Sequence, residues 1–202
     1  MRYILSILFL LTSLYGRVFY VDSSSRSDFN TVIEALDSTT RNDTIYVSRD
    51  RCNIFGTIQL NGQTLIGESP YECTITNSNS NPLVIGDEYD GSWDGEIINY
   101  HFEWTVEDMG YFFMDVNCTI RNCILTQRNF GTWFTHFSYD SSFEIYNSVF
   151  LGKENTRNTG GIHGNAPSYI YNSIFKDISS LCSTPNCTAY NTIMENSTDS
   201  FY

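Results

Sequence analysis

Short apolar runs recur along the second half of the chain, each built around an asparagine. The runs read TIRNCIL, EIYNSVF, YIYNSIF and TAYNTIM. Runs rich in Ile, Val, Tyr, Phe and Thr and bounded by Asn, Ser, Gly or Pro predict strands rather than helices. Recurrence after about 20 to 50 residues is typical of stacked-repeat folds. Here the spacings are 25, 25 and 19 residues, between Asn122, Asn147, Asn172 and Asn191.

The segments between these runs are too rich in Gly, Asn and Pro to hold a crossover helix. Strands that recur in one direction without such helices predict a coil of parallel strands, with turns about 4.8 Å apart. The asparagines would form its corners, because Asn adopts the left-handed conformation more easily than most residues, and their amides could hydrogen-bond along the stack. Ordinary antiparallel strands with a chance resemblance are the alternative.

Stacked copies would place equivalent residues in inward-facing columns. Three columns are expected: Ile120, Ile145, Ile170 and Ala189; Cys123, Ser148, Ser173 and Thr192; and Leu125, Phe150, Phe175 and Met194.

A helical pattern lies near the amino terminus. Asp28 is a candidate N-cap, and Phe29, Val32, Ile33 and Leu36 follow at the spacing of one helix face. Two runs typical of strands come next, DTIYVS at 43–48 and TIQLNGQTLIGES at 57–69. Such a helix would cover the first turn of the coil, where open strand edges otherwise invite aggregation.

The asparagine repeat and this opening together resemble the right-handed parallel β-helix of the pectate-lyase-like superfamily. The resemblance implies an all-β solenoid with a short N-terminal capping helix, as a single domain over residues 17–202. TGGIHG and YNSIF also resemble the GGA(I/L) and FxxN repeats of polymorphic outer membrane proteins, which are secreted β-helical adhesins. The opening is similar to that of pectin methylesterases too, but residues 49–52 replace the family's glycine-tyrosine-x-glutamate step, so no catalytic residue can be carried over.

The first sixteen residues have the composition of a secretory leader. Arg2 supplies a positive charge, and an apolar run extends from Ile4 to Leu14. A membrane helix needs about 20 apolar residues, and no later segment approaches that length. We predict a signal peptide over residues 1–16 and no membrane span after it. A retained anchor is the alternative, because Leu14 occupies a place where a small residue is usual.

The six cysteines also fit an oxidising compartment. Cys182 and Cys187 flank a turn-prone tetrapeptide, which favours a local disulfide. Cys52 and Cys73 are about one turn apart and could bridge neighbouring turns. The remaining two, at 118 and 123, are either buried thiols or a pair.

Four Asn-X-Ser/Thr acceptors, at Asn42, Asn117, Asn186 and Asn196, complete the set of export signals. We expect a glycoprotein that is secreted or held at the extracellular surface.

The strand pattern is interrupted between Ile85 and Val116. We expect roughly one ordinary turn of the coil, enlarged by a loop of about 20 residues, with an insertion over about residues 87–115 on one face. Carboxylates beside exposed aromatic rings could bind a sugar or hold Ca²⁺ through hard oxygen ligands. A solvated acidic loop whose rings pack on the coil is the alternative. No calcium-loop or H-E-x-x-H spacing occurs, and no other metal or cofactor is indicated. The candidate binding residues are Asp87, Glu88, Asp90, Trp93, Asp94 and Trp104.

The charge of the chain and the absence of a catalytic family motif limit the classes of function to consider. With 11 basic against 23 acidic residues and a net charge of −12, the chain lacks the clustered Lys and Arg that nucleic acid binding needs. The first hypothesis is a non-catalytic β-helical protein that binds a glycan or another protein, as adhesins do. The second is a small polysaccharide lyase or glycoside hydrolase, with unknown catalytic residues. The third is a coat protein whose copies associate end to end through the C-terminal turn.

Overall fold

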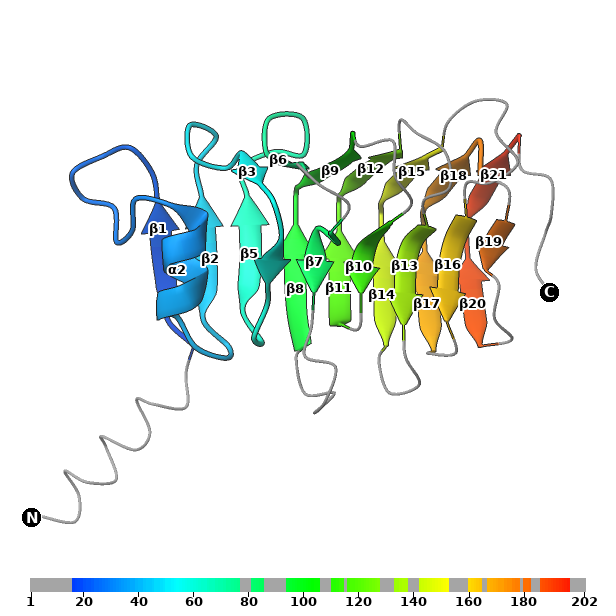
Figure 1. Cartoon of the computed structure of the whole chain (residues 1–202), viewed down its shortest axis with the longest axis horizontal. Coiled ribbons are helices and arrows are strands. Elements are labelled where there is room, and N and C mark those ends of the chain that lie inside the picture. Colours follow the sequence, from blue (N-terminus) through cyan, green and yellow to red (C-terminus); the bar gives the residue numbers. More distant parts are fainter. Residues whose placement is uncertain are drawn as a thin grey trace, which may run out of the picture.

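The chain folds as a right-handed parallel β-helix, which confirms the class predicted from the repeat (Figure 1). The computed structural model describes residues 16–76, 81–85, 94–105, 110–114, 116–127, 133–137, 142–152, 160–164, 167–178, 180–182 and 186–196. Three parallel sheets run along the solenoid, and each turn contributes one strand to each sheet where the turn is complete. Among the described residues, no helix is long and apolar enough to cross a membrane.

Sheet A has eight strands in the order of the chain. They are β1 (Val18–Val21), β2 (Thr44–Val47), β5 (Thr64–Gly67), β8 (Asp94–Ile98), β11 (Asn117–Arg121), β14 (Phe143–Tyr146), β17 (Ser168–Tyr171) and β20 (Cys187–Tyr190).

Sheets B and C have seven and six strands and close the coil. Sheet B contains β3 (Ile54–Phe55), β6 (Thr74–Thr76), β9 (His101–Trp104), β12 (Ile124–Gln127), β15 (Val149–Leu151), β18 (Ile174–Lys176) and β21 (Ile193–Glu195). Sheet C contains β4 (Ile58–Gln59), β7 (Val84–Ile85), β10 (Tyr111–Met114), β13 (Trp133–Phe137), β16 (Gly160–Gly164) and β19 (Ser180–Cys182).

Asparagines turn the chain from sheet A into sheet B. Asn122, Asn147, Asn172 and Asn191 all have left-handed backbones, with φ between 48° and 52°. Their side chains form a ladder in which each Nδ2 donates to the Oδ1 one turn earlier, at 3.2 to 3.4 Å. Asn99, with a φ of 61°, occupies the same corner one turn before Asn122 and donates to the carbonyl of the preceding turn.

A second corner follows sheet B, and the sequence did not reveal it. Asp177 and Asn196 have φ values of 57° and 55° there, and Nδ2 of Asn196 donates to Oδ1 of Asp177 at 3.0 Å. In the last turns, a corner of this kind lies at each end of the sheet B strand, and the two corners together fix the register of these turns.

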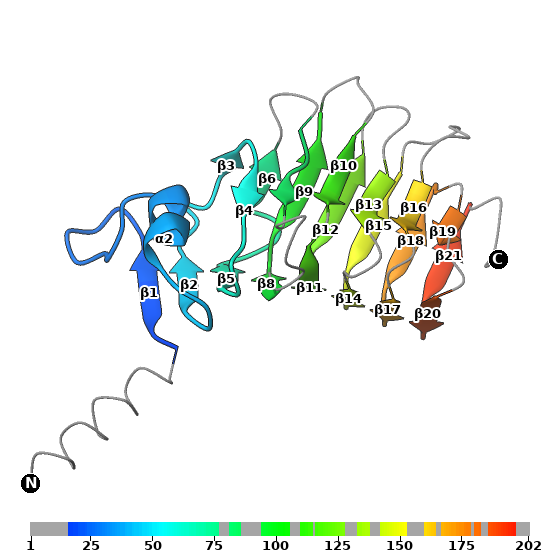
Figure 2. The same ribbon diagram turned by 60° about the horizontal axis from the view of Figure 1, so that its bottom comes forward.

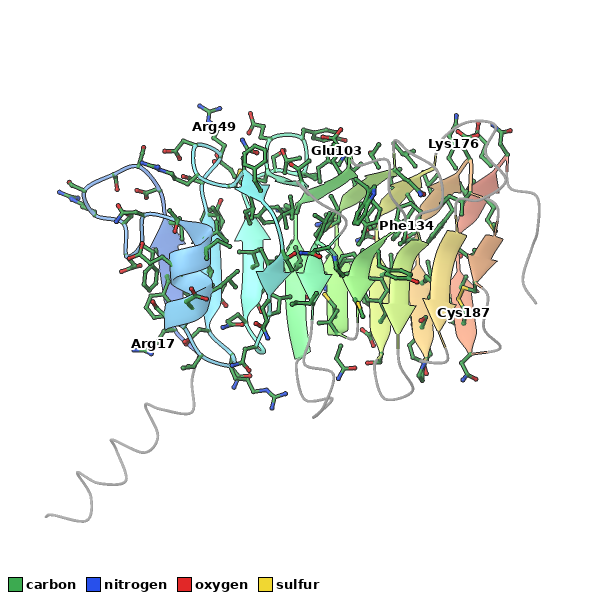
Figure 3. The ribbon with its side chains drawn as sticks, viewed as in Figure 1. Arg17, Arg49, Glu103, Phe134, Lys176 and Cys187 are labelled. Carbon is green, nitrogen blue, oxygen red and sulfur yellow. A yellow bond between two sulfur atoms is a disulfide. The ribbon has the colours of Figure 1, made fainter. Side chains whose placement is uncertain are left out.

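The expected inward columns are confirmed. Strand pairing aligns Ile120, Ile145, Ile170 and Ala189, and in sheet B it aligns Leu125, Phe150, Phe175 and Met194. The rings of Phe150 and Phe175 stack at 4.3 Å with a 10° angle between their planes. Phe134 from sheet C meets Phe150 edge to face at 4.9 Å inside the coil (Figure 3). Aromatic contacts between turns add to the free energy of apolar burial.

The one helix in the described part of the chain, α2 (Val32–Ser38), lies at the N-terminal end of the solenoid beside β1 and β2 (Figure 2). Its N-cap is Thr31, whose Oγ1 accepts from the amide of Glu34, and not Asp28 as predicted. Asp28 instead accepts from the backbone N–H of Tyr20. The apolar face is centred on Val32, Ala35 and Leu36, whereas Ile33, predicted to face the coil, is 43% exposed.

The described part of residues 87–115 is a turn of the coil and not an inserted loop. Strands β8, β9 and β10 pair with their neighbours in sheets A, B and C, and Ile97 aligns with both Leu65 and Ile120. The predicted break was wrong for these strands because their sequence, EIINYHFEW, keeps the corner asparagine but differs in the flanking residues. Residues 86–93, 106–109 and 115 lie outside the described residues.

Candidate functional site

The structure changes the set of candidate binding residues. Trp104 is fully buried, with its ring 5.8 Å from that of Phe112, so its proposed role in sugar binding was wrong. Asp94 is the first residue of β8. Asp87, Glu88, Asp90 and Trp93 lie outside the described residues, and their proposed role stays a prediction. No group of three or more potential metal ligands gathers among the described side chains.

The outer face of sheet A carries a row that the sequence analysis did not single out. Alternate residues of a strand point to the same face, so Arg121, Tyr146, Tyr171 and Tyr190 share one outward register position in β11, β14, β17 and β20. We call these four residues the tyrosine row. The repeat phrases EIYNSVF and YIYNSIF contain two of its tyrosines, and the spacing of the repeat is the signal that could have revealed it.

The rings of the tyrosine row stack along the axis of the solenoid. Tyr146 and Tyr171 lie 4.8 Å apart with a 10° angle between their planes, and Tyr171 and Tyr190 lie 5.3 Å apart with an angle of 7°. The guanidinium carbon of Arg121 lies 3.9 Å from the centroid of Tyr146 and covers the other face of that ring. Tyr190, at the far end, is 54% exposed.

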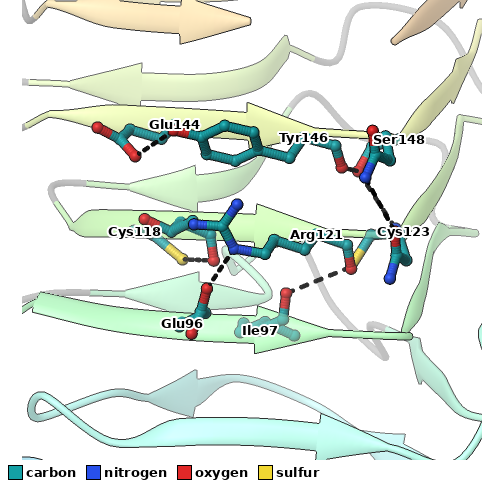
Figure 4. Close-up of polar contacts among 11 residues, drawn as sticks. Glu96, Ile97, Cys118, Arg121, Cys123, Glu144, Tyr146 and Ser148 are labelled. Carbon is teal, nitrogen blue, oxygen red and sulfur yellow. Dashed lines mark hydrogen bonds and ion pairs between the residues drawn. The ribbon is translucent and has the colours of Figure 1, made fainter. Parts of the chain in front are cut away.

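Two carboxylates hold the start of the row in place (Figure 4). Nε of Arg121 donates to Oε1 of Glu96 at 2.6 Å, and the hydroxyl of Tyr146 donates to Oε2 of Glu144 at 3.0 Å. Partial burial by itself would lower the pKa of Arg121, but the hydrogen bond and charge of Glu96 raise it above its ordinary value. Burial and the hydrogen bond to Glu144 raise the pKa of Tyr146. Both groups therefore keep their protons at neutral pH.

A cavity of about 220 Å³ opens beside Glu144. Glu144 and Glu96 occupy the same outward register position, two strands apart, with Thr119 between them. The cavity lies at the amino-terminal ends of β11 and β14 and is lined by Gly95, Asn117, Cys118, Thr119, Ser142 and Glu144.

The six cysteines form two disulfides and two free thiols, one of the arrangements that the sequence analysis left open. Disulfides join Cys52 to Cys73 and Cys182 to Cys187. Cys118 and Cys123 are buried free thiols. Burial raises the pKa of Cys118 and raises that of Cys123 to about 12. A thiol with such a pKa stays protonated at neutral pH and is a poor nucleophile, so neither residue is suited to covalent catalysis.

The three histidines lie on two sheets of the coil. His101 lies on sheet B, with Nε2 2.9 Å from the hydroxyl of Thr126. His136 and His163 are far apart in sequence but are paired at the same register position of the adjacent strands β13 and β16 in sheet C.

Comparison with known proteins gives likeness in structure only. No family model matches the chain, and no curated protein does so at a significant level. A pectin methylesterase from Aspergillus niger is 14% identical over 92% of this chain and 85% of its own, with a TM-score of 0.43. A pectin methylesterase from carrot is 11% identical over 90% and 83% of the two chains, with a TM-score of 0.40. The class rests on strand pairing, which defines three parallel sheets wound into a parallel β-helix.

Proposed function

We propose that this protein is a non-catalytic extracellular binding protein whose outer face of sheet A docks another protein with a basic surface. The observation that carries the proposal is the stacked tyrosine row, an ordered aromatic strip on an outward-facing sheet. Tyrosine is enriched at protein interfaces because it offers a large apolar area together with a hydroxyl. The two disulfides fit an extracellular location.

The geometry of the rings favours a protein over a glycan as the partner. Sugars stack on open ring faces, but the faces of Tyr146 and Tyr171 are covered by their neighbours along the row. Tyr146 and Tyr171 therefore offer ring edges and hydroxyl groups to solvent, whereas Tyr190, 54% exposed at the end of the row, stacks on Tyr171 through one ring face. Such a strip suits a flat partner surface that supplies hydrogen bonds. Because the rings are already stacked, little side-chain entropy is lost on docking.

Charge favours a basic partner. The chain has a net charge of −12, and Glu144 lies beside the start of the tyrosine row, where Glu96 is paired with Arg121. Negative surfaces of this kind raise the association rate of positively charged partners and reject acidic ones.

The test uses the purified full chain on one array of extracellular proteins and one array of glycans. We expect binding to basic proteins that weakens at least tenfold in the double variant Tyr146→Ala/Tyr171→Ala. Tyr71→Ala is the matched control, since Tyr71 is 86% exposed and lies outside sheet A. Binding that is confined to glycans, or binding that the double variant leaves unchanged, contradicts the proposal.

A glycoside hydrolase is the second candidate, on one observation. Glu96 and Glu144 share one outward register position two strands apart, with about 10 Å between their Cα atoms. Inverting enzymes use two carboxyl groups about 6.5 to 9.5 Å apart, and two outward side chains at this Cα spacing are compatible with such a pair. A lyase is disfavoured at this site, because the guanidinium of Arg121 is bound to Glu96 and lies on the ring of Tyr146. Release of reducing ends from polygalacturonate, with and without Ca²⁺, that both Glu96→Gln and Glu144→Gln abolish would replace the binding proposal.

End-to-end association of copies is a separate proposal. Tyr190 and Ile193 are 54% and 60% exposed on the last described turn of the solenoid. Light scattering over a range of concentrations tests it: we expect a mass that rises with concentration and a smaller rise for Ile193→Lys. A monomer at every concentration rules it out.

A further inference from the structure

Three of the four Asn-X-Thr/Ser acceptors fall in one row along sheet A. Their threonines, in β2, β11 and β20, have the same register position. β5 and β8 separate the first two of these strands, and β14 and β17 separate the last two. At about 4.8 Å per strand, neighbouring acceptors are about 14 Å apart. The row is linked strand by strand through Thr44, Thr64, Glu96, Thr119, Glu144, Tyr169 and Thr188.

The three acceptor asparagines lie where the chain enters sheet A, within two residues of the starts of β2, β11 and β20. These strands start at their lower ends in Figure 1. Asn42 and Asn186 are exposed. Asn117 is half-buried, and its Oδ1 accepts from both the amide and the hydroxyl of Ser142, which fixes the plane of its side-chain amide. Asn117 and Thr119 are alternate residues of β11, so both side chains belong to its outer face.

The fourth acceptor is placed differently. Asn196 lies at the corner after sheet B, has a φ of 55°, and uses its Nδ2 to bind Asp177. Asn196 thus resembles the corner asparagines, which hydrogen-bond to the neighbouring turn. It is not part of the row of acceptors on sheet A.

We propose that Asn42, Asn117 and Asn186 carry N-linked glycans that form a row along one edge of the solenoid, one at every third turn. The co-reactant is an oligosaccharide joined to a lipid pyrophosphate. In each transfer a bond forms between Nδ2 of the asparagine and C1 of the first sugar. The bond between C1 and the phosphate oxygen breaks, the amide nitrogen loses one proton, and the lipid pyrophosphate leaves with the bonding electron pair. No oxidant or reductant is needed.

The glycan row has a consequence for the outer face of sheet A. The tyrosine row lies two residues beyond the acceptor threonines and four beyond the glycan-bearing asparagines at β11 and β20, so the glycans border it on one side. The sugar on Asn117 stands at the cavity beside Glu144 and restricts access to it. A docking partner then approaches from the side of the corner asparagines. The modification itself does not depend on the proposed partner.

The test is glycopeptide mass mapping of the full chain, secreted from cultured eukaryotic cells. Endoglycosidase treatment leaves one N-acetylglucosamine on each occupied asparagine. We expect this tag at Asn42, Asn117 and Asn186, and the intact mass falls by one glycan in each of Thr44→Ala, Thr119→Ala and Thr188→Ala. These variants keep the asparagine and its hydrogen bonds, which guards against misfolding.

The matched controls replace the same threonines by serine. Because serine preserves the acceptor sequence, Thr44→Ser, Thr119→Ser and Thr188→Ser should retain all three glycans. An untagged asparagine at any of the three positions overturns the row. Loss of a glycan in a serine variant as well as in its alanine counterpart also overturns it, since the effect would then not follow the acceptor sequence.

Discussion

The backbone N–H of Cys123 donates to the hydroxyl oxygen of Ser148, which lies 25 residues later and one turn further along the coil, at 3.2 Å. The N–H of Ser148 donates in the same way to the hydroxyl of Ser173. Each hydroxyl in turn donates to the carbonyl two residues before it, and the thiol of Cys123 does likewise to Arg121. A column of small polar side chains thus satisfies the buried backbone just after each corner.

We expect Ser148→Ala to lower the free energy of unfolding by about 1 to 3 kcal/mol, because it leaves the buried N–H of Cys123 without an acceptor. Cys123→Ser should change it by less than about 1 kcal/mol, since a hydroxyl can replace the thiol as donor to Arg121. Urea unfolding followed by circular dichroism measures both. Ser38→Ala, at the exposed end of α2, is the control, and equal losses in the Ser148 and Ser38 variants would contradict the column.

Asn147→Ala should destabilise the fold by about 2 to 4 kcal/mol. The loss combines a left-handed backbone, which costs a residue with a Cβ about 1 to 2 kcal/mol, with two broken ladder bonds, to Asn122 and from Asn172. Asn147→Gly removes only the second contribution and should cost about 1 kcal/mol less. The exposed Asn30→Ala serves as the control. The corner interpretation fails if glycine proves worse than alanine at this position.

Stability should fall in alkaline solution. Burial raises the pKa of Cys123 from 9.0 to about 12, so the folded state holds this proton after the unfolded state has released it. The contribution of the protonated Cys123 thiol to the free energy of unfolding is fully present below pH 9. This contribution is lost between pH 9 and about 12, by up to about 1.4 kcal/mol per pH unit. Cys118 adds a loss of the same sign, and so does the buried Tyr100 above pH 10.

Urea unfolding between pH 7 and 10.5 measures this loss, and the disulfides must remain intact. The slope above pH 9 should be smaller in Cys123→Ser, because serine does not titrate in this range. Identical slopes for the two proteins would show that Cys123 ionises alike in the folded and unfolded states.

Trp104→Ala should act on the fold rather than on a binding site. Trp104 is fully buried and packs on Phe112, so its truncation should cost about 3 to 5 kcal/mol in unfolding free energy. Differential scanning calorimetry checks this, with the exposed Tyr71→Ala expected to shift the midpoint very little. A Trp104 variant as stable as the parent would return this residue to the candidates for ligand binding.

Local sequence was sufficient for the repeating part of the fold. The recurrence of asparagine after 25 residues set the turn length, and the corner follows from the conformational preference of that residue, so strands, corners and inward columns between Asn122 and Asn191 could be predicted. The same inference failed for β8 to β10, because apolar and acidic substitutions hid a turn whose only preserved mark was Asn99. The N-cap at Thr31 was missed because Asp28 is used by β1.

The candidate site depended on the tertiary structure. That Tyr146 and Tyr171 occur in equivalent phrases is visible in the sequence, but their stacking and the cover that Arg121 provides arise only when separate turns lie about 4.8 Å apart. Burial of Trp104 and alignment of Thr44, Thr119 and Thr188 likewise depend on how turns of unequal length come into register. The sequence by itself determined the turn and its corner, which are local properties of the backbone. Only the tertiary structure decided which side chains meet across turns, because those contacts depend on the register between strands distant in the chain.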